Sequence, residues 1–138
     1  MKKTYLCMCV TLALILGVFL AGMSGTGTGS PNQGLVSSPY DAKIKDSSGS
    51  EVTIGSVTFD GKTSFSAYLG KGKVQIPFEN ISRIEVKGDS ICVKLSGAGT
   101  MCNLRINGVS KVYGKTAYGT YQVPLKDVVW IDLTKQKQ

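Results

Sequence analysis

The chain has 138 residues, with 16 Lys and Arg against 9 Asp and Glu and no His, so its formal net charge is +7. The absence of His excludes Ser-His-Asp and Cys-His catalysis and leaves few ligands for a hydrolytic zinc site. The basic residues are spread singly and include only two Arg, Arg83 and Arg105, whereas a nucleic-acid-binding domain usually carries clustered Lys and Arg. Composition therefore argues against most hydrolases and against nucleic acid as a partner.

The N-terminus has the pattern of an export signal. Lys2 and Lys3 precede an apolar stretch at residues 6–20, and small residues follow it. This order is typical of a secretory signal peptide, which we place at residues 1–24. The alternative is an uncleaved anchor, because the 18 residues of 6–23 fall within the roughly 17–25 that span a bilayer as a helix. We expect an exported protein, periplasmic or extracellular, that is either released or anchored through residues 6–23.

Composition divides the rest of the chain into three segments. Residues 25–40 are rich in Gly, Ser, Thr and Pro, which predicts a flexible linker. Residues 41–133 carry the apolar residues of a fold, and residues 134–138 form a polar tail. A folded part of this length supports one hydrophobic core. We therefore expect a single β-domain.

The β-domain sequence repeats itself. Residues 57–86 align with residues 104–133 at a constant offset of 47, without a gap. Turn residues, prolines and apolar residues recur together, among them Asp60/Asn107, Gly61/Gly108, Gln75/Gln122, Pro77/Pro124 and Ile84/Ile131. This predicts one supersecondary unit built twice, as residues 42–87 and 90–133, with both units sharing one core.

Each unit begins with two segments that flank a Gly/Ser turn and read as a hairpin. These segments are residues 42–45 and 51–59 in the first unit and 91–95 and 100–106 in the second. Asp60-Gly61 and Asn107-Gly108 follow, and such dipeptides readily adopt the positive φ angles of a two-residue hairpin turn. A second hairpin is therefore expected at this place in each unit.

The end of each unit alternates and then changes period. In residues 73–76 and 120–123, apolar and polar residues alternate, so Val74, Ile76, Tyr121 and Val123 should face the core and Gln75 and Gln122 should face solvent. Pro77 and Pro124 should end these strands because Pro has no backbone N–H. Apolar residues then recur every third position, which predicts a short helical turn before the last strand: Phe78, Ile81 and Ile84, and likewise Leu125, Val128 and Ile131.

This strand, helical turn and strand resembles the last corner of SH3-like and Sm-like small barrels, over about a dozen residues per unit. The resemblance implies nothing about function. Val, Ile, Thr, Tyr and Phe dominate the segments between turns, and no long stretch has helical period. The expected fold is all-β, a β-sandwich or small barrel of about eight to ten antiparallel strands.

Cys92 and Cys102 stand five residues on either side of Gly97, the middle of a predicted hairpin turn. They should face each other across adjacent strands and form a disulfide in an oxidising compartment. The first unit has Gly55 where Cys102 aligns, so this cross-link is expected in the second unit alone. We interpret it as structural.

Two sets of residues are candidates for chemistry. Glu85 aligns with Asp132, and two carboxylates could support a glycosidase-like reaction, although their strand positions place both side chains in solvent. Basic and aromatic residues gather in the second unit, where they could bind a sugar or an anionic polymer: Arg105, Lys111, Tyr113, Lys115 and Tyr118. We expect no cofactor and no metal.

Three functional hypotheses follow. The first is an exported, non-enzymatic cell-envelope module that binds a protein partner, or has a structural role in a larger assembly, through a sheet face or an exposed edge strand. The second is an electrostatic binder of an anionic glycan, lipid or other polymer, which high salt should release. The third is a small atypical enzyme with an unusual site, either the carboxylates Glu85 and Asp132 or a Ser/Lys pair.

Overall fold

The computed structural model describes residues 37–97, 99–106 and 110–138. The expected signal peptide or anchor, and most of the expected linker, lie outside these residues. Within them there are ten β-strands, two single-turn 3₁₀ helices and no α-helix. The elements are β1 (Tyr40–Asp46), β2 (Glu51–Phe59), β3 (Ser64–Leu69), β4 (Gly72–Pro77), η1 (Phe78–Asn80), β5 (Ile81–Lys87), β6 (Ser90–Leu95), β7 (Thr100–Arg105), β8 (Lys111–Thr116), β9 (Gly119–Pro124), η2 (Leu125–Asp127) and β10 (Val128–Lys135).

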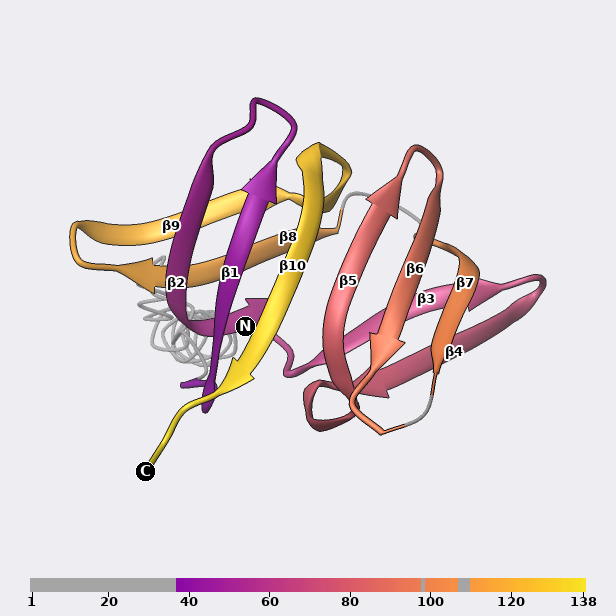
Figure 1. Cartoon of the computed structure of the whole chain (residues 1–138), viewed down its shortest axis with the longest axis horizontal. Coiled ribbons are helices and arrows are strands. Elements are labelled where there is room, and N and C mark those ends of the chain that lie inside the picture. The colour runs from indigo at the N-terminus through magenta and orange to yellow at the C-terminus, as the bar shows by residue number, and fades with distance from the viewer. Residues whose placement is uncertain (1–36, 98, 107–109) are drawn as a thin grey trace, which may run out of the picture. The chain divides into compact units, whose positions relative to one another are not determined.

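The strands form one curled, half-barrel sheet in which every pair is antiparallel, so the expected all-β fold is confirmed. Their order is β4-β3-β7-β6-β5-β10-β1-β2-β8-β9. Figure 1 shows that β3 and β4 curl behind β5 to β7, and that β8 and β9 curl behind β10, β1 and β2. The sheet thus has two similar halves, joined where β5 pairs with β10.

We name the two halves by what they contain. The disulfide half comprises β4, β3, β7, β6 and β5, and the terminal half comprises β10, β1, β2, β8 and β9. Both proposed repeat units contribute strands to each half. In the disulfide half, β6 and β7 lie beside strands from the earlier unit, and in the terminal half β8, β9 and β10 lie beside β1 and β2.

The prediction of a second hairpin in each unit is wrong, although the turn predicted for the first unit forms. Asp60 and Gly61 have φ angles of 49° and 77°, as a type I′ turn requires, and Phe59 and Lys62 form a single bridge across it. Beyond this bridge β2 pairs with β8, and β3 pairs with β4 and β7. The turn at Asp60-Gly61 is therefore a crossover between the two halves. The equivalent Asn107-Gly108 lies outside the described residues.

Hydrogen bonds hold this crossover in place. The Asp60 backbone N–H donates to the Lys111 carbonyl at 3.0 Å, and the Asp60 carboxylate accepts from the Lys111 N–H at 2.9 Å and from the Ser110 hydroxyl at 2.7 Å. Nearby, Phe78 N–H donates to the Thr63 carbonyl, and Leu125 N–H donates to the Ser110 carbonyl. The last two bonds occur at positions 47 residues apart.

The core lies on the concave face of the curled sheet. Ile76 and Val123 are buried, Val74 and Tyr121 pack against the core, and Gln75 and Gln122 are exposed, as the alternation predicts. The strands β4 and β9 end at Pro77 and Pro124, and each is followed by a 3₁₀ turn. The largest fully buried side chains are Phe65, Phe78, Ile44, Ile54, Ile84, Ile91, Leu104, Leu125 and Ile131.

The three-residue spacing after each proline has two causes. As expected, a single 3₁₀ turn follows the proline and separates Phe78 from Ile81, whose N–H donates to the Phe78 carbonyl.

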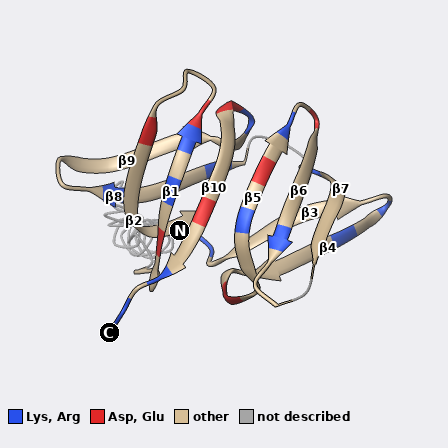
Figure 2. Cartoon of the chain, in the orientation of Figure 1, with Lys and Arg blue, Asp and Glu red and all other residues tan. Residues whose placement is uncertain are grey.

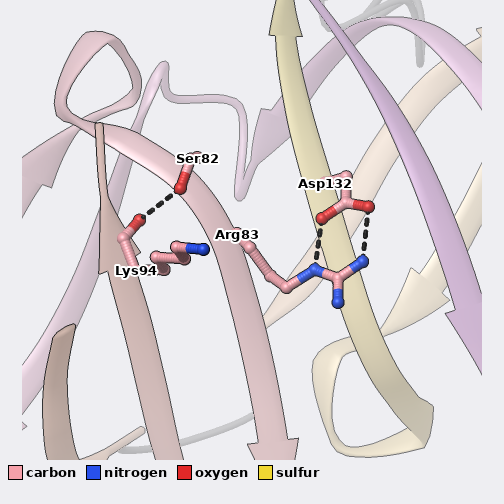
Figure 3. Close-up of polar contacts among 4 residues, drawn as sticks. All are labelled: Ser82, Arg83, Lys94 and Asp132. Carbon is pink, nitrogen blue, oxygen red and sulfur yellow. Dashed lines mark hydrogen bonds and ion pairs between the residues drawn. The ribbon is translucent and has the colours of Figure 1, made fainter. Parts of the chain in front are cut away.

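The spacing within the strand that follows has a different cause. Each 3₁₀ helix covers three residues only, and Ile81 and Ile84 both lie in β5. A register shift between Ile81 and Arg83 leaves Ser82 without a register partner in β6, although its hydroxyl donates to the Lys94 carbonyl at 3.1 Å (Figure 3). A similar shift occurs where β10 pairs with β1. Because a bulge of one residue resets the alternation, two residues three apart can both face the core.

The C-terminal residues 134–136, part of the expected polar tail, take part in the fold. β10 extends to Lys135, which pairs with Tyr40. Beyond it, the Gln136 backbone N–H donates to the Pro39 carbonyl at 2.9 Å, and its side chain donates to Asp41 Oδ1 at 2.6 Å. The described residues contain no helix long and apolar enough to cross a bilayer.

Candidate functional site

Three of the predicted surface residues share one face of β8. Val112 and Gly114 are buried, so the alternation of a strand turns Lys111, Tyr113 and Lys115 to the opposite, outer face. Tyr118 lies in the β8–β9 turn and is fully exposed. The structure therefore brings a lysine-tyrosine-lysine row together on the terminal half, with a second tyrosine at its end.

Arg105 lies elsewhere. It ends β7, where it pairs with Tyr68 of β3, and its guanidinium donates to the Gly70 carbonyl at 3.4 Å. Arg105 is therefore in the disulfide half, because the chain crosses to the terminal half between β7 and β8. With Lys126 it lines a separate cleft of about 440 Å³. The five predicted residues thus belong to two surfaces.

The two candidate carboxylates are both engaged on the outer face of the central strands. Asp132 in β10 accepts two hydrogen bonds from the guanidinium of Arg83 in β5, one of them 2.7 Å long (Figure 3). This bond raises the pKa of Arg83. Glu85 lies 3.5 Å from the ammonium of Lys87. The Arg83 guanidinium therefore contacts both carboxylate oxygens of Asp132, and Glu85 also has a cationic neighbour.

Trp130 lies on the same outer face and is not among the residues that the sequence analysis identified. The Arg83 guanidinium lies 4.7 Å from its ring centroid, and the Lys43 ammonium lies 5.9 Å from it. Lys43 also forms a 2.8 Å ion pair with Glu51, which lowers the pKa of that carboxyl. Trp130 is two residues before Asp132, so strand alternation could have placed both side chains on this face. Figure 2 shows charges of both signs along β5, β10, β1 and β2 here.

The expected disulfide is present between Cys92 in β6 and Cys102 in β7, with an S–S distance of 2.08 Å. Ile91 and Val93 are buried, so Cys92 lies on the outer face of β6. The register pairs of Val93 with Met101 and Lys94 with Thr100 place the two cysteines opposite each other. Such a bond is compatible with an oxidising, extracytoplasmic compartment.

Among the strands of residues 37–97, 99–106 and 110–138, those at the two ends of the sheet, β4 and β9, each pair with one neighbour only. Lys73 lies within β4, whereas β9 contains no charged residue (Figure 2). Position 120, which is 47 residues after Lys73, holds Thr. On the core side of β9, partial burial raises the pKa of Tyr121. The β9 edge is therefore the less protected of the two.

A cleft of about 220 Å³ lies over β3 and the crossover turn. Its polar lining comprises Asp60, Lys62, Ser64, Ser66, Tyr68, Lys73 and Ser110, and Phe59 and Ile106 contribute apolar surface.

No group of three His, Cys, Asp or Glu side chains that could bind a metal occurs in residues 37–97, 99–106 and 110–138.

The fold and these surfaces define a small all-β protein built on one ten-stranded antiparallel sheet. Comparisons with protein-family models, with curated proteins and with solved structures return no match for this chain. Its function must therefore be argued from its own surfaces.

Proposed function

We propose that this chain is an exported, non-enzymatic cell-envelope module that binds a protein partner by adding a strand of that partner to its sheet at β9. The observation that carries the proposal is the uncharged edge of β9, which pairs with β8 alone among the strands that the structure describes. An exposed edge presents unpaired backbone N–H and C=O groups to an extended peptide, which can form the next strand. The export-signal pattern and the disulfide support an extracytoplasmic location.

The two edges of the sheet favour β9 over β4 as the docking strand. Natural proteins protect edge strands with lysine, because pairing would bring its charge against the incoming strand. β4 has Lys73 in this role, and β9 has Thr120 at the equivalent position. Beside β9, Tyr118 is fully exposed at the tip of the hairpin, where its ring can pack on a partner. Val123 is buried on the core face, so an added strand would extend that apolar face.

The test exchanges the two edge residues. The tagged full chain, purified with its disulfide intact, is used to capture proteins from cell-envelope extract with a high-salt wash. We expect the wild type and Lys73→Thr to retain the same protein and Thr120→Lys to lose at least about 90% of it, because a lysine blocks edge pairing. All three proteins should have the same thermal unfolding midpoint, since both positions are exposed.

Two results would contradict the proposal. Equal capture by Thr120→Lys would show that the β9 edge is not the docking surface. Retention of this same chain, together with a dimer in sedimentation that Thr120→Lys dissociates, would show that β9 pairs with a second copy instead of a different protein.

A second candidate function is supported by the row of Lys111, Tyr113 and Lys115 on the outer face of β8. This row could bind an anionic glycan or lipid head group, since its two cations flank an aromatic side chain. Such binding should weaken steeply as salt rises, and Lys111→Ala with Lys115→Ala should abolish it. Unchanged binding of heparin or anionic vesicles by this double variant would remove the case for the row.

A further inference from the structure

The cleft over β3 is lined by small residues at positions where β8 carries large ones. Ser64 and Ser66 lie on the outer face of β3, since Phe65 and Ala67 between them are buried. At the positions 47 residues later, β8 carries Lys111 and Tyr113. On this face β3 carries two serines and lines a cleft, whereas β8 carries a lysine and a tyrosine.

The charged groups of the cleft favour an anion. Lys62 and Lys73 both line it and are exposed, and neither forms an ion pair with a carboxylate of the described residues. Asp60 is also in the lining, but its two oxygens already accept hydrogen bonds from Ser110 and from the backbone of Lys111. The lining thus carries two ammonium groups and one carboxylate, and the ammonium groups are the ones that no carboxylate of the described residues pairs with.

The uncharged groups favour a ligand with hydroxyls. Ser64 Oγ accepts a 2.8 Å bond from the Gln75 amide, so the Ser64 hydroxyl proton is free to donate. The Ser110 hydroxyl donates to Asp60 and retains lone pairs that can accept. Tyr68 lies beside Lys73 in the β3–β4 ladder and adds an aromatic side chain to the cleft. Donors, acceptors and a ring face together match the surface of a sugar better than that of a bare ion.

We propose that this cleft binds one uronic-acid residue of an acidic polysaccharide. Its carboxylate would pair with Lys62 and Lys73, and its ring hydroxyls would bond Ser64, Ser66 and Ser110. The cleft of about 220 Å³ is smaller than the roughly 300–1,000 Å³ of most small-molecule pockets, so it fits a single sugar unit. This site is separate from the β9 edge, because β3 and β9 lie in different halves of the sheet.

The test titrates the full chain with galacturonate and, in parallel, with galactose and inorganic phosphate, and follows amide chemical shifts. We expect galacturonate to shift the resonances of β3 and of the crossover turn, with a Kd on the order of 1 mM for so small a ligand. Galactose and phosphate should bind at least about tenfold more weakly, since galactose has no carboxylate for the lysines and phosphate has no ring hydroxyls for the serines. Binding of galacturonate should weaken with added salt because it depends on two exposed cations.

Two variants locate the binding. Ser66→Tyr introduces the residue that β8 carries at the equivalent position, and it should fill the hollow and abolish binding without unfolding the sheet. Lys62→Ala should weaken binding at least about tenfold, because it removes one of two ion-pairing groups. Lys71→Ala is the matched control, since Lys71 is exposed in the neighbouring turn but does not line the cleft.

Several outcomes would overturn the proposal. Equal affinity for galactose would show that the carboxylate is not recognised, and equal affinity for phosphate would show that the site selects any anion. Undiminished binding by folded Ser66→Tyr, or the same loss in Lys71→Ala as in Lys62→Ala, would place the ligand outside the cleft. These results leave the β9 edge untouched, since Thr120→Lys tests it separately.

Discussion

The two halves of the sheet share a strand order but fill their cores differently. In the disulfide half, Phe65 and Phe78 are buried, and they meet Phe59 edge to face at ring-centroid distances of 5.7 and 5.3 Å. The equivalent positions of the terminal half hold Val112 and Leu125. The same strand pattern therefore accepts an aromatic or an aliphatic filling. The curled sheet depends on apolar volume at these positions more than on residue identity.

The outer faces of the two halves differ in the bonds that link their strands. A covalent bond between Cys92 and Cys102 joins two strands of the disulfide half. The terminal half instead has the ion pair of Lys43 with Glu51, and Asp132 reaches across the joint to Arg83. A disulfide limits the freedom of the unfolded chain, whereas exposed ion pairs add little stability. We expect stability to be unequally divided between the halves.

The largest expected effect is at the centre of the aromatic core. Phe78→Ala should cost about 3–5 kcal/mol of the free energy of unfolding, because Phe78 also contacts Tyr40 edge to face at 5.6 Å. Leu125→Ala, the matched change in the other half, removes fewer buried atoms and should cost less, within a range of about 2–5 kcal/mol. Urea unfolding of both variants with the disulfide intact measures this difference. A larger loss at Leu125 would show that the aliphatic half is the tighter core.

Removal of the disulfide should have the next largest effect. Cys92→Ser with Cys102→Ser should lower the free energy of unfolding by roughly 3 kcal/mol, as expected for closing a loop of this length. Reductant should lower the wild-type unfolding midpoint to that of the variant and leave the variant unchanged. A variant as stable as the oxidised wild type would mean that the cross-link contributes no stability.

A close approach of two strands makes Gly114 the next most sensitive position. A Cβ there would lie 2.5 Å from Cδ1 and 2.8 Å from Cβ of Ile54, so Gly114→Ala should cost about 1–3 kcal/mol. The equivalent residue of the other half is already a buried alanine, Ala67. Ile54→Val removes the Cδ1 atom, so Gly114→Ala should cost less in that background. Additive losses in the double variant would rule out this contact as the cause.

The smallest expected effect is at the β1–β2 turn. Asp46 accepts hydrogen bonds from the backbone N–H groups of Ser48 and Ser50 and from the Ser48 hydroxyl, and the hydroxyl bond is the main cause of its lowered pKa. Leu95 occupies the corresponding place in the β6–β7 turn, where its N–H also donates to the carbonyl four residues ahead.

Asp46→Asn tests this contribution through its pH dependence. Because the folded-state pKa is lowered, the carboxylate stabilises the protein above its ordinary pKa of 3.8, and the advantage disappears as the pH falls through the lowered value. Wild type should therefore be slightly more stable than Asp46→Asn at pH 6 and equal to it near pH 2, as urea midpoints at both values would show. An advantage that persists at low pH would exclude the carboxylate as its source.

Local features of the fold could be predicted from the sequence because local chemistry decides them. Pro77 and Pro124 ended their strands, the cysteines faced each other, and the apolar residues of β4 and β9 turned inward. Partner choice could not be predicted. When two units carry the same pattern of apolar positions, a strand can pair within its unit or with the other unit and bury the same face. Asp60-Gly61 fixed the turn but left open which strand would lie beside β2.

For the candidate surfaces, too, local features could be predicted from the sequence and features that depend on strand pairing could not. Lys111, Tyr113 and Lys115 lie on one face because they alternate along a single strand, which sequence reading resolves. Arg105 was misplaced because its position depends on the crossover between halves. The hollow over β3 was not predicted, because the serines that line it have no distinctive signal in the sequence.

The position of β10 in the sheet makes the order of synthesis matter. This strand pairs with β5 on one side and with β1 on the other. β1, the first of the described strands, therefore cannot pair with β10 until the C-terminal end of the chain has been synthesised. A growing chain that has not reached residue 128 leaves β1 and β5 with open edges, which are prone to wrong pairing. Secretion of the chain in an extended form would let all ten strands become available together.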